Sequence, residues 1–180
     1  MSGPHRISIV GTSGSGKTSL ARRAAGLLGV PHVELDAIFH LPGWTELPEA
    51  EFRVAVAALA GGPGWVIDGN YGAVRDLVWG RADQIVFLDY ERALVMRRVI
   101  RRSVARALDR RPMWNGNRED AREWIRAGHP IRWAWSTHGE RRLSYRATAA
   151  GDHRVVLLRT PRDAEAWLAR LATSARGAAC

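Results

Sequence analysis

Short apolar runs alternate with longer segments of helical periodicity along almost the whole chain. The runs are four to six residues long, and most end at a glycine or an aspartate, as buried parallel strands often do. We therefore predict five strands, at residues 6–10, 33–36, 65–68, 84–89 and 155–158.

The segments between these runs carry helix signals. Gly29 follows one periodic segment, Pro48 opens another, and Thr160 with Asp163 forms a capping box before the last. We predict helices at 17–28, 48–60, 73–79, 91–110 and 131–150, one from residue 119 after a capping Asn117, and a last one from residue 160. The alternation predicts an α/β fold, in which helices cover both faces of a parallel sheet.

Composition narrows the class of protein further. The chain has 180 residues, enough for one α/β domain over residues 1–180 and too few for two of ordinary size. It has no apolar run of the roughly 18 residues that a membrane span needs, and no signal-peptide pattern at its start. The single cysteine, Cys180, cannot form an internal disulfide. We therefore expect a cytoplasmic protein without a membrane partner.

The positive charge is concentrated in one segment. The net charge is +9, and residues 92–146 alone hold 15 arginines and five acids, a local net charge of +10. Such a segment suits nucleic acid, an acidic membrane surface or a phosphorylated small molecule, and charge alone does not choose among them. Lys17 is the only lysine among 27 basic residues.

That lysine belongs to a phosphate-binding pattern at residues 11–18. The pattern consists of a glycine, any four residues, and then glycine, lysine and threonine. Small residues between a strand and a helix let backbone N–H groups surround phosphate, and the helix N-terminus adds positive charge. Lys17 would reach the β- and γ-phosphates, and Thr18 would ligate Mg²⁺. We predict that ATP with Mg²⁺ binds Gly11, Thr12, Ser13, Gly14, Ser15, Gly16, Lys17, Thr18 and Ser19.

Three aspartates follow or end the predicted strands. Asp68 and Asp89 each end an apolar strand, so either could hold Mg²⁺ or act as a helix cap. We favour Asp68 as the metal and catalytic residue because Gly69 and Asn70 follow it. Asp36 could orient or deprotonate an acceptor hydroxyl, although capping or a turn explains it nearly as well.

Four segments together resemble the DNA topology modulation (FlaR-related) proteins, an adenylate-kinase-like group of P-loop kinases. They are Gly11–Thr18, Leu35-Asp36, Pro42-Gly43-Trp44 and Trp65–Tyr71. The resemblance implies a three-layer α/β/α P-loop NTPase fold with strand order 2-3-1-4-5. It also implies a mobile acceptor-binding region and an arginine-rich helical lid, which we place at about 97–150.

The resemblance also implies roles for individual residues. In the broader nucleoside monophosphate kinase family, Asp68-Gly69 matches a segment near Mg²⁺ and the acceptor phosphate. The next residues of that family are usually an aromatic, proline and arginine, whereas this chain has Asn70 and Tyr71. The usual acceptor arginine is therefore missing, and Arg75 is a candidate substitute. The lid arginines are expected to be Arg98, Arg101 and Arg102, and the acceptor site is expected to include Asp36, Trp44, Gly69, Asn70, Tyr71 and Arg75.

Two classes of function remain open from the sequence. The leading hypothesis is an ATP-dependent phosphotransferase whose acceptor is a nucleoside monophosphate or a hydroxylated small molecule. The alternative is a nucleotide-dependent, nucleic-acid-binding regulator with slow ATPase activity. That alternative rests on the mixture of arginines with tryptophans that could stack on bases, namely Trp114, Trp124, Trp133 and Trp135.

Overall fold

A computed structural model describes residues 5–109, 114–117 and 130–178. It contains a five-stranded sheet of order β2-β3-β1-β4-β5 in which every neighbouring pair is parallel, so the predicted α/β fold and strand order are confirmed. The strands are β1 (Arg6–Gly11), β2 (His32–Glu34), β3 (Trp65–Asp68), β4 (Gln84–Leu88) and β5 (Val155–Leu158).

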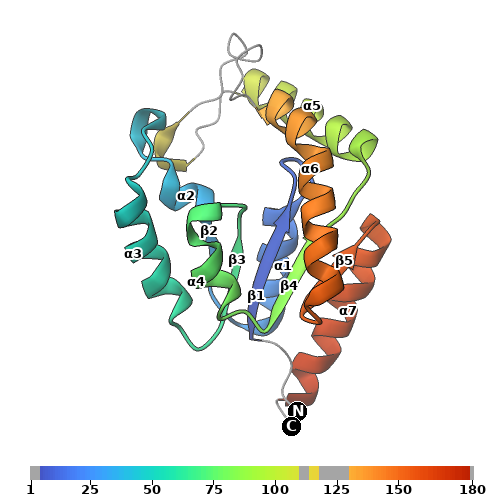
Figure 1. Cartoon of the computed structure of the whole chain (residues 1–180). Coiled ribbons are helices and arrows are strands. Elements are labelled where there is room, and N and C mark those ends of the chain that lie inside the picture. The colour runs from blue at the N-terminus through green and yellow to red at the C-terminus, as the bar shows by residue number, and fades with distance from the viewer. Residues whose placement is uncertain (1–4, 110–113, 118–129, 179–180) are drawn as a thin grey trace.

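Helices fill the connections between these strands (Figure 1). They are α1 (Lys17–Leu28), α2 (Leu35–Phe39), α3 (Glu49–Ala60), α4 (Arg75–Trp79), α5 (Arg92–Asp109), α6 (Pro130–Gly151) and α7 (Pro161–Ala178). Three short 3₁₀ turns are η1 (Pro42–Trp44), η2 (Gly72–Val74) and η3 (Trp114–Gly116). The helix predicted from residue 119 lies outside the described residues.

The sheet is covered on both faces, as strand alternation requires. On one face, Ile7 and Ile9 of β1 pack with α1 and α7. On the other face, Val10 packs with α3, α4 and the Tyr145 side chain of α6. Because all strands are parallel, their carboxyl ends share one edge, and ligands of open α/β sheets bind at that edge.

One predicted strand was wrong at its carboxyl end. The segment 33–36 was expected to be extended, but β2 stops at Glu34 and Asp36 lies in the first turn of α2. Leu35, Ile38 and Phe39 have the spacing of one helix face, and all three pack into the core beside α3. A short helix therefore buries more apolar surface here than an extended segment would.

The predicted helix 73–79 is also divided in the structure. Its first part forms η2, and α4 begins only at Arg75. The capping box before α7 is confirmed, since the Asp163 backbone N–H donates to the Thr160 hydroxyl and the Asp163 carboxylate accepts from the Thr160 backbone N–H.

Asp89, just beyond β4, anchors helix α6 to the sheet. Its fully buried carboxylate accepts from Arg142 Nε at 2.6 Å and lies 2.7 Å from an Arg146 nitrogen. A buried carboxylate that holds two arginines of one helix fixes the position of that helix. Asp89 therefore has a structural role that accounts for its burial.

We expect Asp89→Asn to lower the free energy of unfolding by about 2–3 kcal/mol, because the two partly buried arginines lose their counter-charge. Thermal denaturation should show a clear drop in the melting temperature. Asp76→Asn is the matched control, since its pair with Arg53 is solvent-exposed and should contribute little. Equal melting temperatures for the two variants would contradict the anchoring role.

Candidate active site

The loop between β1 and α1 forms a tight turn at the carboxyl edge of the sheet. Gly14 and Gly16 have φ angles of 83° and 98°, in the left-handed region that glycine adopts without strain. The Ser15 backbone N–H closes the turn by donating to the Thr12 carbonyl at 3.0 Å. The Ser15 hydroxyl is buried, and it has no hydrogen-bond partner among the described residues.

Lys17 is the first residue of α1, and its ammonium group folds back over this loop. Its Nζ lies 3.4 Å from the Thr12 carbonyl oxygen. Burial lowers the pKa of Lys17 below its ordinary value, the charges of Asp36 and Asp68 act to raise it, and those of Arg102 and Arg141 act to lower it. Charges from four elements, α2, β3, α5 and α6, thus act on the loop lysine.

Helix α5 packs against the loop. Arg98 Nη1 donates to the Ser15 carbonyl at 2.8 Å, and Arg102 Nη2 donates to the Ser13 hydroxyl at 3.1 Å. Arg101 is exposed and makes no hydrogen bond or ion pair with the residues that the structure describes. The structure thus brings two of the three predicted lid arginines to the loop.

Gly14 sits so close to α5 that a side chain has no space. A Cβ atom added there would lie 2.5 Å from the Val99 Cγ2 atom. We expect Gly14→Ala to lower the free energy of unfolding by about 2 kcal/mol, through backbone strain and overpacking. If the loop binds Mg-ATP as the sequence predicts, the affinity should fall about tenfold as α5 shifts from the loop.

Gly26→Ala is the control for that substitution. Gly26 lies within α1, and an added Cβ there would meet nothing within 4 Å. Alanine should stabilise the helix at this position by about 0.5–1 kcal/mol. Denaturation curves and nucleotide titrations compare the two variants, and unchanged values for Gly14→Ala would show that α5 does not constrain the loop.

Asp68 ends β3 beside β1, and it is only 2% exposed. Its Oδ2 atom lies 3.2 Å from His32 Nε2. Thr18 is partly buried on the first turn of α1, and Ser19 beside it is exposed. No group of three His, Cys, Asp or Glu side chains in the described parts of the chain could hold a metal by itself. A metal here would therefore need oxygens from a bound phosphate as well.

Gly69 and Asn70 connect β3 to the loop. Gly69 has a φ of 145°, and an added Cβ would lie 2.7 Å from Leu35 Cβ, so this position needs glycine. Asn70 Oδ1 accepts from the Gly11 backbone N–H at 3.1 Å, and its Nδ2 donates to the Gly11 carbonyl. Asn70, which we expected to contact the acceptor, thus fastens the phosphate loop to β3.

Asp36, Tyr71 and His40 form a hydrogen-bonded group across the edge of the sheet. The Tyr71 hydroxyl donates to Asp36 Oδ1 at 2.6 Å and lies 3.5 Å from His40 Nε2. Burial and the charge of Asp36 raise the pKa of Tyr71 well above its ordinary value, so the phenol keeps its proton. The structure thus joins two predicted acceptor residues and adds His40, which sequence reasoning missed.

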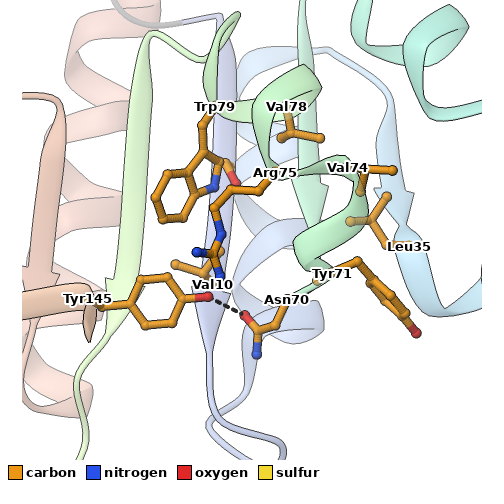
Figure 2. A pocket seen from close by; sticks show the side chains of 11 residues that line it. Val10, Leu35, Asn70, Tyr71, Val74, Arg75, Val78, Trp79 and Tyr145 are labelled. Carbon is orange, nitrogen blue, oxygen red and sulfur yellow. Dashed lines mark hydrogen bonds between the residues drawn. The ribbon is translucent and has the colours of Figure 1, made fainter. Parts of the chain in front are cut away.

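A small pocket opens next to this group (Figure 2). The Arg75 guanidinium lies 5.0 Å from the Trp79 ring centre and 5.7 Å from that of Tyr145. The Tyr145 hydroxyl donates to Asn70 Oδ1 at 3.4 Å. The Tyr71 hydroxyl points away from Arg75 in this view. The pocket is lined by Ser8, Val10, Leu35, Gly69, Asn70, Tyr71, Val74, Arg75, Val78, Trp79 and Tyr145.

Residues 114–117, which lie between α5 and α6 in sequence, are fastened to the α2 side of the site (Figure 1). The Trp114 indole N–H donates to Glu34 Oε2 at 2.8 Å. Asn117 accepts from the Trp44 backbone N–H at 3.0 Å and donates to the Leu41 carbonyl at 2.9 Å. The Asn117 side chain therefore holds η1, and the helix that it was expected to cap lies outside the described residues.

The tryptophans do not form a shared stacking surface in the described parts of the chain. Trp114 stacks against His40, with ring centres 6.1 Å apart, and its N–H is used by Glu34. Trp135 is 58% exposed, and its ring lies 4.9 Å from the Arg92 guanidinium carbon. The side chains of Trp124 and Trp133 lie outside the described part. No described helix is long and apolar enough to cross a membrane.

Solved structures of similar fold include two small kinases. A shikimate kinase from Bacteroides thetaiotaomicron aligns with a TM-score of 0.54 and 17% identity, over 94% of this chain and 97% of that chain. A gluconokinase from Sinorhizobium meliloti 1021 aligns with a TM-score of 0.51 and 22% identity, over 94% of each chain. No family model matches the chain, and no curated protein matches it in sequence. At these identities the likeness supports the fold alone, which this chain shares with the two kinases, and the DNA topology modulation group stays a prediction.

Proposed function

We propose that this protein is an ATP-dependent phosphotransferase that acts on a small acceptor. The observation that carries the proposal is the position of Lys17. Its ammonium lies on a glycine-rich loop that opens α1, among the charges of Asp36, Asp68 and Arg102. A buried cation between a phosphate loop and two carboxylates suits the neutralisation of a reacting phosphate group.

The loop residues fit a nucleotide triphosphate. The buried Ser15 hydroxyl has no partner among the described residues, and the left-handed glycines leave room for close approach by phosphate. Thr18 and Asp68 would hold Mg²⁺, which supplies charge neutralisation at the phosphates when bound. Arg98 and Arg102 already contact the loop and would stabilise the charge that develops during transfer.

The position of Asp36 favours an acceptor that is phosphorylated on a hydroxyl group. Its carboxylate already accepts a hydrogen bond from one hydroxyl, that of Tyr71, and it is one of the two carboxylates whose charge acts on Lys17. A carboxylate in this place can accept the proton of an acceptor hydroxyl. The two kinases of similar fold are named for shikimate and gluconate, both hydroxylated small molecules.

Arg75 extends the acceptor site toward an anionic group. It is held by two aromatic rings, and it makes no ion pair with a described carboxylate. An arginine so placed can bind a carboxylate or a phosphate of the acceptor. Both remaining acceptor classes, a nucleoside monophosphate and a hydroxylated acid, carry such a group. Trp44 could close the site beside His40, because the two ring centres are 5.4 Å apart.

An ATP-coupled screen tests this function directly. ADP release is measured with nucleoside monophosphates and with small alcohols, including shikimate, gluconate and the uncharged polyol sorbitol. We expect ADP release to rise sharply with one class of acceptor and not with sorbitol. If no acceptor raises ADP release while single-stranded DNA binds with a steep salt dependence, the nucleic-acid-binding regulator becomes the better explanation.

A further inference from the structure

We infer that Tyr71 acts as a latch on Asp36, which restrains ATP hydrolysis until an acceptor hydroxyl displaces the phenol. This inference rests on the proposed function, because it assumes that Asp36 faces the reacting phosphate. It adds a positioning role for Tyr71 and His40 that the transfer reaction itself does not require.

Tyr71 and Asp36 are joined by a short hydrogen bond. Its length of 2.6 Å is that of a charge-assisted O–H···O⁻ bond, which is stronger than a hydrogen bond between neutral groups. The phenol cannot easily lose its proton beside this carboxylate, so it acts as the donor. One oxygen of Asp36 is therefore occupied, and an attacking water or acceptor hydroxyl must compete with the phenol for it.

Asp36 also acts on the lysine of the loop. Among the charges that act on the Lys17 ammonium, that of Asp36 has the largest effect. The carboxylate therefore lies within electrostatic range of the cation that would contact the γ-phosphate. A free carboxylate so near a reacting phosphate could also activate water, and this would waste ATP.

The Tyr71 phenol has a second possible hydrogen-bond partner, the imidazole of His40. His40 Nε2 lies 3.5 Å from the Tyr71 oxygen, and His40 Nδ1 is buried without a hydrogen-bond partner among the described residues. The imidazole is held between the rings of Phe39, Trp44 and Trp114. When an acceptor hydroxyl donates to Asp36, the phenol can turn its proton to His40 and lose no hydrogen bond.

Phosphoryl transfer to the acceptor and hydrolysis of ATP by water form and break corresponding bonds. An oxygen of the acceptor, or of water, forms a bond to the γ-phosphorus. The bond from that phosphorus to the leaving ADP oxygen breaks, and its electron pair stays on ADP. The proton of the attacking oxygen passes to Asp36. An acceptor can displace the phenol because the rest of the acceptor molecule contributes binding energy, and water lacks that contribution.

A purely structural role for Tyr71 predicts a different result. Its ring packs against Phe39 and Phe52, with ring centres 4.7 Å and 5.1 Å apart. Tyr71→Phe keeps this packing and removes only the hydroxyl. A structural role would leave hydrolysis unchanged or lower it, whereas loss of a latch raises it.

The experiment measures hydrolysis of Mg-ATP without any acceptor, in the wild type, Tyr71→Phe, Asp36→Asn and the double variant. We expect Tyr71→Phe to raise kcat about three- to tenfold with an unchanged KM for ATP, because the occupied oxygen of Asp36 becomes free to accept a proton from water. Asp36→Asn should remove this increase in the double variant. Thr173→Val on α7 is the control for the loss of a hydroxyl that lies outside the site.

Two outcomes overturn the inference, and they differ from a failure of the proposed function. Hydrolysis by Tyr71→Phe at or below the wild-type rate, with unchanged Mg-nucleotide affinity, shows that there is no latch. An increase that persists in the Asp36→Asn background shows that the hydroxyl acts elsewhere. If the wild type itself binds no Mg-nucleotide, the proposed function fails, and the inference fails with it.

Discussion

Replacing Lys17 by alanine is expected to lower ATP turnover by at least about a hundredfold, because the loop loses the only ammonium that can neutralise the transferring phosphate. No other lysine exists in the chain to replace it. Arg98 and Arg102 cannot take its place easily, since each is already bonded to the loop. ADP release at saturating acceptor, or acceptor-independent hydrolysis, measures the effect.

The Lys17→Ala protein should nevertheless fold normally. The Lys17 side chain is partly buried, and among the described residues its ammonium makes one long hydrogen bond, at 3.4 Å, so its removal relieves desolvation and breaks little. Arg22→Ala is the matched control on the same helix, because the Arg22 side chain is 71% exposed. Wild-type turnover in the Lys17→Ala protein, or its unfolding, would contradict this account of the loop.

Asp68→Asn is expected to have the second large effect, a loss of about a hundredfold in turnover that is only partly recovered at high Mg²⁺. The amide keeps the shape of the carboxylate and its place beside His32, but it is a much weaker ligand for Mg²⁺. Turnover is measured against Mg²⁺ concentration at fixed ATP.

The same titration separates the two aspartates that the sequence could not separate. Asp89 is engaged by Arg142 and Arg146, so Asp89→Asn should destabilise the protein and leave its Mg²⁺ requirement unchanged. If Asp89→Asn rather than Asp68→Asn shifts the Mg²⁺ requirement, the assignment of the metal ligand is wrong.

The local features of the loop could be predicted from the sequence because they lie within a few residues of one another. The turn, the start of α1 at Lys17 and the stop at Gly29 all follow from residue types at fixed spacings. The parallel sheet followed in the same way from short apolar runs between helices. The strand order came from the resemblance and was confirmed.

The acceptor side could be predicted only in part. Asp36 was placed on a strand because four residues are too few to show helical periodicity. His40 is the residue directly after α2, and its backbone N–H donates to the Asp36 carbonyl, so recognition of α2 would have placed the two residues close together. Other contacts join distant residues, such as Trp114 to Glu34 and Tyr145 to Asn70, 80 and 75 positions apart. Sequence spacing carries no signal for such pairs.

The arginine stripe shows a similar limit. Charge pattern alone grouped Arg98, Arg101 and Arg102, but only Arg98 and Arg102 contact the loop. These two are four positions apart, and Val95 and Val99, which are buried, share the same spacing. The position of the arginines relative to the buried apolar face of α5 therefore indicates which side chains reach the loop. The number of arginines on the helix does not.

The central claim is that the loop after β1 binds a nucleotide triphosphate through Lys17. Calorimetric titration of the purified protein with Mg-ATP tests it most directly. The account predicts saturable binding at one site per chain, with affinity strongly reduced by Lys17→Ala and retained in Arg22→Ala. Absence of heat of binding with any Mg-nucleotide, or equal affinity in Lys17→Ala and wild-type protein, would contradict it.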